Sequence, residues 1–285
     1  MKIYICTNKF QKIAAKISAF SFKKFGFENI EILELERNEL LMSKLNLSYL
    51  RNKKLTKFKY DLQSFTLLRF LPFERKNQEN CLIIDPDVFA VKDPTSFLKN
   101  IISNNKFDIG CTVINSLFRS EVILLKNNNF SWSFKNIIDD LFNHKIDYSD
   151  LINLKSNKYF SNIFTLPIKM NNHDTIDSDT LLLHTSKRIT QPWKEGLKID
   201  FEKKEISSKY RITQFIKKIF GFKYNKELFS KNYIQHSNTL VSDLVIKLFK
   251  NALDDEIISD EELKNCISNN YISQEFYKKV LKLRN

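Results

Sequence analysis

Residues 81–97 read CLIIDPDVFAVKDPTSF, and this stretch decides the fold that we expect. The uninterrupted apolar run at 81–84 predicts a strand buried on both faces, as in the interior of an open α/β sheet. Asp85 and Asp87 follow on either side of Pro86, which lacks the amide hydrogen that a sheet needs and therefore marks the end of the strand. Open α/β sheets bind their ligands at that edge.

On their own, Asp85 and Asp87 admit two interpretations. Carboxylates at positions i and i+2 beyond a buried strand can direct two hard oxygen ligands at one divalent ion, which in turn can hold a diphosphate. Asp and Pro are also common in simple turns, where they fix the backbone and form local hydrogen bonds. A metal site and a plain turn therefore both stay open at this point.

The segments before this strand alternate between strand and helix patterns. Residues 2–6 and 30–35 predict strands, and the apolar residues between them recur with a helical period that Gly26 would end. The first strand is not followed by the glycines of a GxGxxG or GxxxxGK[ST] phosphate loop. A bound nucleotide would need another means of holding its phosphates, and a metal on the two aspartates would provide one.

Further elements are expected on both sides of the carboxylates. Residues 61–72 predict a helix with Arg69 inside its apolar stretch, where the arginine either snorkels to the surface or leans toward an anion site. Helices are also expected from Pro94 to residue 102 and at 134–142. Additional strands are predicted at 107–114, 121–125, 163–166 and 179–184.

His184 ends the last predicted strand. A lone histidine in such a position is more often hydrogen-bonded or solvated than bound to metal. Here hydroxyl and cationic side chains follow it, and Gln191, Pro192 and Trp193 form a rigid turn behind. A neutral imidazole that completes two carboxylates on one ion, with cations reaching a diphosphate, is a coherent metal site.

The composition indicates a globular protein of the cytoplasm. The chain has 285 residues, 42% of them hydrophobic, which is ample for a packed core. Its four cysteines lie far apart without a CxxC spacing, so we expect them to be reduced. The N-terminus enters a strand pattern at once and no apolar run approaches the ~20 residues that span a bilayer, so we expect neither export nor membrane insertion.

The net charge of +13 points to a polyanionic partner, and nucleic acid, an anionic membrane surface or a nucleotide-linked substrate would each fit. From Lys203 to Lys231 nine Lys or Arg stand against two Glu, a net +7. Apolar residues within 212–220 recur at helical spacing beside basic residues and predict a short basic amphipathic helix. It either docks on the core with a solvated basic side or lies on anionic lipid.

Four segments, taken in order, resemble the bacterial glycosyltransferases of the A-type fold that are related to the glycogenin and lipopolysaccharide galactosyltransferase group. They are KIYICTN (2–8), SFTLLRFLP (64–72), IIDPDVFAVKDPTSF (83–97) with its D-x-D signature, and LPIKMNN (166–172) followed by LLLHTSKRITQPW (181–193). The resemblance implies an α/β, Rossmann-like glycosyltransferase A fold with a mixed central sheet. It also implies a nucleotide-sugar-binding catalytic domain over residues 1–200 and a basic, helical C-terminal extension over 201–285.

The resemblance further implies roles for individual residues. Asp85, Asp87 and His184 would bind Mn²⁺ or Mg²⁺ together with the diphosphate of a nucleotide sugar, most simply a UDP-sugar. Asn171 would lie near the transferred sugar, and Asp87 would belong to the catalytic centre as well. The donor would contact a wider set of residues: Thr7 near the base, together with Asn8, Arg69, Asp85, Lys187, Arg188, Gln191 and Trp193.

The chain departs from the family pattern at two positions. Gln191 stands where the family often has a lysine on the diphosphate, and Lys187 or Arg188 would have to replace that charge. Met170 stands where an aromatic residue usually precedes the asparagine, which alters the expected shape of the sugar pocket.

The implied reaction is metal-dependent transfer of a hexose-like sugar to a glycan or lipid-linked glycan, in the synthesis of a cell-surface polysaccharide. Retention of configuration is implied, whereas an inverting enzyme would need a carboxylate base, for which Asp174, Asp177 and Asp179 are the nearest candidates. We expect such an enzyme in the cytoplasm or peripherally on the inner face of the cell membrane.

Two other functions compete with this one. The basic helix and neighbouring aromatic residues could form a nucleic-acid-binding surface, but the charge lies in the tail, and paired aspartates without a metal would repel phosphate. A glycosyltransferase fold that is inactive and kept for interaction is the third possibility.

Overall fold

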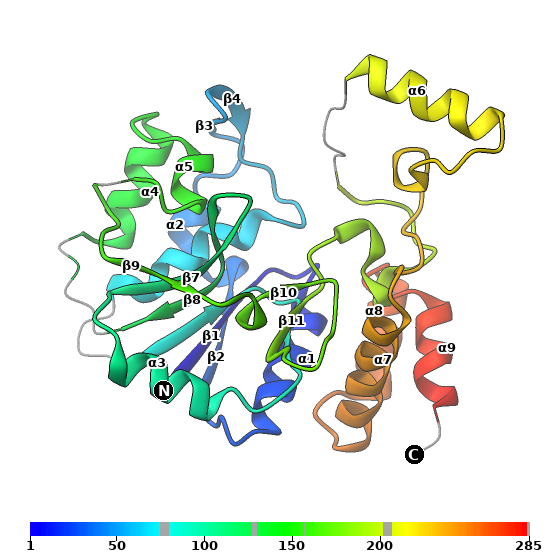
Figure 1. Ribbon diagram of the computed structural model, residues 1–285, viewed down its shortest axis with the longest axis horizontal. Helices are drawn as coiled ribbons and strands as arrows, with labels where there is room; N and C mark the ends of the chain where they lie inside the picture. Colours follow the sequence, from blue (N-terminus) through cyan, green and yellow to red (C-terminus); the bar gives the residue numbers. More distant parts are fainter. Residues whose placement is uncertain (75–79, 127–129, 131, 157, 202–206, 284–285) are drawn as a thin grey trace.

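The computed structural model describes residues 1–74, 80–126, 130, 132–156, 158–201 and 207–283. Its centre is a six-stranded sheet in the order β2-β1-β5-β8-β7-β9 (Figure 1). The strands β1, β2 and β5 run parallel, β8 is antiparallel to both β5 and β7, and β9 is parallel to β7. The expected mixed α/β sheet is thereby confirmed. Its strands are β1 Lys2–Thr7, β2 Ile30–Glu34, β5 Cys81–Ile84, β7 Ile109–Ile114, β8 Leu117–Leu125 and β9 Ile163–Leu166.

Strand β5 is the interior strand that its apolar run predicts. It lies between β1 and β8, and all four of its residues are buried. Because both faces of the strand are covered, no polar residue interrupts it. The chain leaves the sheet at Asp85, whose amide donates to the carbonyl of Glu121 on β8 at 3.1 Å.

A smaller sheet in the order β10-β11-β6 begins directly after the two aspartates. Its strands are β6 Val88–Ala90, β10 Asn172–His173 and β11 Leu182–His184. The strand predicted at 179–184 is wrong in its first half, because the Asp177 carboxylate accepts hydrogen bonds from the amide of Asp179 and the hydroxyl of Thr180, both at 2.9 Å. Such local side-chain bonds favour a turn over a sheet ladder.

The helix predicted at 61–72 is present, but as a 3₁₀ helix, η2 Ser64–Glu74, with Pro72 inside it. The hairpin of β3 Ser48–Arg51 and β4 Lys54–Lys57 has no counterpart in the predictions. Asn52 and Lys53 make its tight turn with positive φ, and the mostly polar strands have little apolar alternation to reveal them. The helices preceding residue 200 are α1 Lys12–Lys23, α2 Glu39–Met42, α3 Thr95–Asn104, α4 Phe134–Phe142 and α5 Tyr148–Ile152, with 3₁₀ turns η1 Leu35–Arg37, η3 Ile168–Met170, η4 Arg188–Thr190 and η5 Pro192–Lys194.

The C-terminal helices share a hydrophobic core with α1 and with the turn that follows His184. Trp193 of η5 is fully buried and packs between Phe89 of β6 and Phe249 of α7. The extension therefore supports the small sheet from one side, while the domain boundary near residue 200 stays a prediction. Its elements are α6 Ser208–Ile219, η6 Lys226–Leu228, α7 Thr239–Asp254, α8 Asp260–Ser268 and α9 Gln274–Lys282. Among the residues described, no helix is both long and apolar enough to cross a bilayer.

We predict that Asp140 on α4 stabilises the fold in a pH-dependent way. Its carboxylate accepts from Lys158 and from the hydroxyl of Tyr159, and these bonds hold the pKa of Asp140 at about 2. A lowered carboxyl pKa stabilises the folded state above the unfolded pKa, near 4, and this contribution disappears as the pH falls toward about 2. Asp140→Asn should therefore lower the midpoint of urea unfolding at neutral pH, and the difference from wild type should vanish near pH 2.

The exposed Asp150→Asn is the control and should leave the midpoint unchanged. If the loss caused by Asp140→Asn were the same at every pH, the effect would be one of packing and not of charge.

Candidate active site

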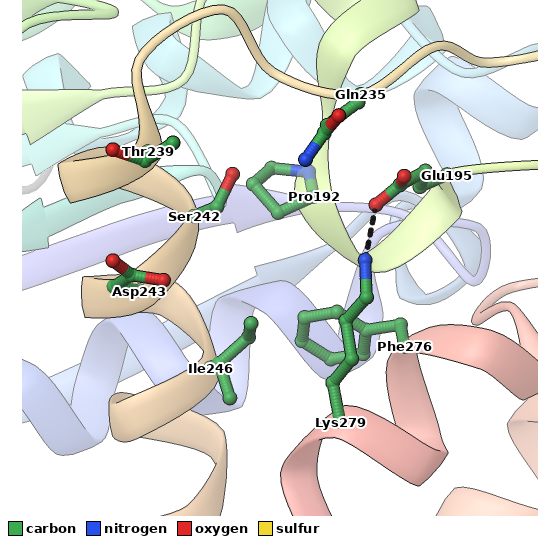
Figure 2. Close-up of a pocket in the computed structure, with 9 residues that line it drawn as sticks. All are labelled: Pro192, Glu195, Gln235, Thr239, Ser242, Asp243, Ile246, Phe276 and Lys279. Atoms are coloured by element: carbon green, nitrogen blue, oxygen red, sulfur yellow. Dashed lines mark hydrogen bonds and ion pairs between the residues drawn. The ribbon is translucent and has the colours of Figure 1, made fainter.

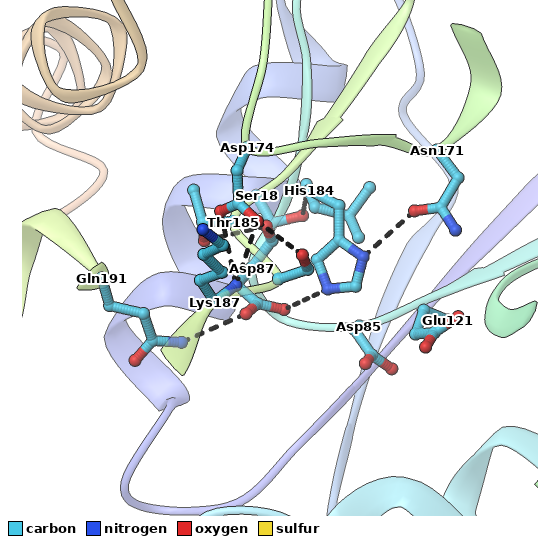
Figure 3. A network of polar contacts seen from close by, with 12 residues as sticks. Ser18, Asp85, Asp87, Glu121, Asn171, Asp174, His184, Thr185, Lys187 and Gln191 are labelled. Atoms are coloured by element: carbon cyan, nitrogen blue, oxygen red, sulfur yellow. Dashed lines mark hydrogen bonds and ion pairs between the residues drawn. The ribbon is translucent and has the colours of Figure 1, made fainter. Parts of the chain in front are cut away.

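The ladder between β6 and β11 brings the predicted metal ligands together. Val88 pairs with His184 across this ladder, so the residue before Val88, Asp87, lies beside the imidazole. The amide of Thr185 donates to the carbonyl of Asp87 at 3.1 Å and closes the pairing. Residues about a hundred positions apart in the chain thus meet at the carboxyl end of β5 (Figure 3).

Asp85, Asp87 and His184 form a buried cluster that is able to hold a metal ion. One ligand atom from each residue lies within 4.8 Å of the others, and among the residues described no other group of this kind is found. Within the cluster, Nε2 of His184 lies 3.4 Å from Oδ1 of Asp87. The three side chains are nearly inaccessible to solvent, with exposed fractions of 4 to 7%.

A relay of amide and hydroxyl groups fixes the imidazole. Nδ2 of Asn171 donates to the hydroxyl of Thr112 at 3.1 Å, which leaves Oδ1 of Asn171 to accept from Nδ1 of His184 at 3.0 Å. A proton on Nδ1 makes the facing Nε2 a lone-pair donor when the ring is neutral. Two lone-pair groups, Nε2 and the Asp87 carboxylate, then face each other, which is the arrangement that a cation between them would satisfy.

Arg69 anchors the other aspartate. Its Nε donates to Oδ1 of Asp85 at 2.8 Å and a terminal nitrogen donates to Oδ2 at 2.5 Å, while the second terminal nitrogen reaches the hydroxyl of Ser120 at 2.8 Å. This two-pronged geometry fixes the plane of the carboxylate. The arginine is buried and paired, and it does not snorkel to the surface.

Negative charge is concentrated around the cluster. Burial disfavours a charged imidazole, but Asp87 and the other nearby carboxylates outweigh it and raise the pKa of His184 to about 9. Burial raises the pKa of Asp85 as well, with Arg69 opposing the shift and Asp87 adding to it. The site therefore favours the presence of positive charge beside Asp87.

Gln191 contacts the cluster directly, whereas the nearby cations Lys187 and Arg188 contact other residues. Nε2 of Gln191 donates to Oδ2 of Asp87 at 3.1 Å, and its own Oε1 is buried without a hydrogen-bond partner in the described part of the chain. Lys187 is exposed and forms an ion pair with Glu227 at 3.6 Å. Arg188 lies over the ring of Phe201 at 5.5 Å, and its pKa is lowered by burial, with Asp87 among the carboxylates that oppose the shift.

Comparison with solved structures finds similar folds, and three of the proteins found are described here. The galactosyltransferase LgtC, solved with donor and acceptor sugar analogues, is 12% identical with a TM-score of 0.45, over 69% of this chain and 90% of that one. GlyE of Streptococcus pneumoniae TIGR4 is 12% identical with a TM-score of 0.43, over 67% of this chain and 56% of that one. Mouse xyloside xylosyltransferase 1 is 9% identical with a TM-score of 0.41, over 65% of this chain and 97% of that one. All three are glycosyltransferases.

No protein-family model matches the chain, and no curated protein matches it in sequence. The similarity to the solved structures is too low to support an argument about function. What the site can do must therefore be argued from its own residues.

Thr7, predicted near the base, and Asn8, predicted to bind the donor, are both fully buried at the end of β1. Nδ2 of Asn8 donates to the carbonyl of Asp61 at 2.7 Å and to the hydroxyl of Ser64 at 3.1 Å. This amide therefore ties β1 to the start of η2, the helix that carries Arg69. Trp193 packs in the core described above, and Met170 is likewise fully buried.

Asp174 directly follows β10, in a turn where its φ is positive at 55°, and its carboxylate accepts several hydrogen bonds. Its carboxylate accepts from the hydroxyl of Ser186 at 2.6 Å, from the amide of Lys187 at 3.2 Å, and from Nε2 of His236 at 3.3 Å. These bonds join the turn after β11 to the segment that leads into α7.

Three polar residues of the site were missed in the sequence. Glu121 of β8 lies beside Asp85, is bound by Arg119, and has its pKa held at about 2 against burial by Arg69, His184 and Arg119. His173 contacts the ring of His184, with 5.0 Å between ring centroids, and burial lowers its pKa to about 4. The polar residues that precede the apolar run of β8 were the available signal for Arg119 and Glu121, but they point to the site only once β8 is known to be antiparallel to β5.

A pocket of about 180 Å³ lies elsewhere, between η5, α7 and α9 (Figure 2). Its walls include Pro192, Ser242, Phe276 and the ion pair of Lys279 with Glu195 at 2.7 Å. None of the residues that line it belongs to the carboxylate and histidine cluster. We therefore place the candidate chemistry at the end of β5 and not in this pocket.

Proposed function

We propose that the protein is a glycosyltransferase that takes a sugar from a nucleotide-diphosphate donor, a UDP-sugar in the simplest case. The observation that carries this proposal is the convergence of Asp85, Asp87 and His184 at the carboxyl end of β5. The buried Arg69 pairs with Asp85, and a second cation, Arg188, interacts electrostatically with Asp87. Such a site is built to gather anionic oxygens around positive charge.

The residues fit a divalent ion. Two carboxylates and the lone pair of an imidazole would hold it, and the imidazole makes Mn²⁺ a better candidate than Mg²⁺, which prefers oxygen ligands alone. When bound, such an ion supplies electrostatic stabilisation of the negative charge on the leaving diphosphate.

The chain's own residues prepare that site. Arg69 holds the carboxylate of Asp85 in one plane, and Asn171 holds His184 with Nε2 toward Asp87. Because these groups are buried and hydrogen-bonded before any ligand arrives, little reorganisation is needed on binding. We propose that Asn171 orients the imidazole of His184 for ligand binding, in addition to lying near the sugar.

We propose a retaining reaction. A base for an inverting reaction must be free to take a proton from the acceptor. Asp174 already accepts from Ser186, Lys187 and His236, and these bonds keep its pKa low although burial opposes them. In a retaining reaction Asp174 would instead fix the turn that carries Lys187 and Arg188.

The acceptor in this proposal is a glycan or a lipid-linked glycan, in the synthesis of a cell-surface polysaccharide. The enzyme would act in the cytoplasm, at the inner face of the membrane where a lipid-carried acceptor presents its sugar.

A thermal-shift screen of nucleotide sugars, with and without Mn²⁺, tests the proposal. Donor and ion together should stabilise the protein by more than the sum of their separate effects. A single ligand at a hundredfold excess over Kd adds about 2.7 kcal/mol to the free energy of unfolding. Sugar transfer or donor hydrolysis should then be measured with the donor that stabilises most. Absence of stabilisation by every nucleotide sugar, in both conditions, would rule the function out.

We predict that Arg188, and not Lys187, replaces the family's lysine on the diphosphate. Arg188→Ala should reduce sugar transfer about tenfold to a hundredfold, the value of one charge-assisted contact to a phosphate. Lys187→Ala should change the rate by less than about threefold, because Lys187 is exposed and paired with Glu227 and exposed pairs contribute little. Steady-state kinetics of both variants check this, and the opposite order would contradict it.

A further inference from the structure

Helix α6 leaves an apolar face in solvent. It stands apart from the sheet and from α7 to α9 in Figure 1. Of its described side chains only Gln214 is buried, and that amide oxygen accepts from the amide of Asn225 at 2.8 Å. The helix that the sequence predicts is therefore present, and in the described structure it does not dock on the core.

The exposed apolar residues lie on one side of the helix. Ile212, Phe215, Ile216 and Ile219 follow the i, i+3, i+4, i+7 spacing of a single helix face and have exposed fractions of 59, 51, 48 and 63%. Phe220 and Phe222 extend the patch beyond the helix end at 70 and 66%. An apolar surface of this kind marks an interaction site on a protein.

Basic residues border this face. Residues 207–231 carry seven Lys or Arg and one Glu, and that Glu227 is paired with Lys187. Four of them lie on α6 itself, namely Lys209, Arg211, Lys217 and Lys218, and Lys218 lies over the ring of Phe229 at 5.3 Å. The two basic residues of the predicted tail at 203 and 204 lie outside the described residues.

We propose that α6 is a membrane-docking helix that lies in the surface of an anionic lipid bilayer. An apolar face inserted at the boundary of the acyl chains, with cations among the headgroups, accounts for both the exposure and the charge. Three of the six exposed apolar residues are isoleucines, which offer no ring for a base to stack on, whereas insertion among acyl chains would use all six, so the face favours lipid over nucleic acid. Long basic side chains at the border of the face can extend to the headgroups.

The position of α6 in the chain relates this surface to the site. The helix begins shortly after the turn that holds Arg188 and Gln191, and Glu227 of η6, just beyond it, pairs with Lys187 of the same turn. Docking would therefore place the candidate active site near lipid. The inference goes beyond the proposed function, because it concerns binding of the free protein to lipid and does not require sugar transfer.

Flotation with vesicles tests the inference without an activity assay. The full chain should float with vesicles of phosphatidylcholine and phosphatidylglycerol and stay behind with phosphatidylcholine alone. Lys209→Gln with Arg211→Gln should weaken binding about thirtyfold, since each basic residue at an anionic surface adds about a factor of five. Ile212→Ser with Ile219→Ser should abolish it. High salt should weaken binding of the wild type.

The matched control is Leu55→Ser with Leu240→Ser, which removes two leucines exposed to 66 and 59% away from α6. It should bind as the wild type does, and circular dichroism should show that all variants are folded. Equal binding to both vesicle types, or none to either, would overturn the inference. So would an Ile212-dependent dimer in sedimentation, or stronger binding to a single-stranded oligonucleotide than to anionic vesicles. Loss of lipid binding with donor binding intact would leave the proposed function untouched.

Discussion

Asp87→Asn should reduce sugar transfer by a factor of about a hundred to a thousand, the cost of removing one group that stabilises the charge of the transition state. Oδ1 of Asp87 faces His184 at 3.4 Å and Oδ2 accepts from Gln191 at 3.1 Å. Asparagine has the same shape and still accepts from Gln191, but it removes the negative charge that pairs with a divalent ion. The fold should therefore persist while the activity is lost.

Single-turnover and steady-state rates on the best donor, with thermal unfolding of the same samples, measure this. Asp255→Asn, an exposed carboxylate at the end of α7, is the matched control and should keep the wild-type rate. Addition of a chelator should reduce the wild type to the level of Asp87→Asn and leave that variant unchanged. A rate for Asp87→Asn within about threefold of wild type would contradict the assignment of the site.

Arg69→Met should lower the free energy of unfolding by about 3–5 kcal/mol, because it leaves the buried Asp85 without its partner. The guanidinium makes two bonds to Asp85 and one to Ser120, and its side chain is only 6% exposed. Asp85 raises the pKa of Arg69 although burial acts against it, so the arginine stays charged.

The double variant Arg69→Met with Asp85→Leu separates charge from packing. Replacing both partners of a buried pair by apolar residues is often neutral, so the double variant should regain most of the stability lost by the single one. Arg37→Met, whose side chain is 77% exposed, should change the free energy by less than about 0.5 kcal/mol. Urea unfolding measures all three. A cost for Arg69→Met as small as that of Arg37→Met would mean that the pair does not hold β5 and η2 together.

The sequence predicted those parts of the fold in which burial and periodicity agree. The apolar run at 81–84 could only be an interior strand, and Pro86 could only end it, so the edge of the sheet was located before any contact was known. Helices α1 and α4 and strand β9 were predictable for the same reason. The β3 and β4 hairpin was not, because only one of its residues is buried and its turn has no glycine.

The site was predictable in its ligands but not in its supports. Asp85, Asp87 and His184 meet because of the pairing of β6 with β11, and a strand of three residues such as β6 has too short a pattern to reveal its partner. Glu121, which the sequence analysis missed, lies at the site only because β8 is antiparallel to β5, a pairing that no local pattern encodes. The bond of Asp87 to Gln191 likewise depends on tertiary packing of the turn around Trp193.

Binding of Mn²⁺ in the presence of UDP, followed by its electron paramagnetic resonance signal, tests the central claim most directly. The wild type and Asp255→Asn should each bind one ion per chain, and Asp87→Asn and His184→Gln should lose it while remaining folded. Equal binding of Mn²⁺ by the wild type and both site variants would show that the carboxylates and the imidazole at the end of β5 do not form a metal site.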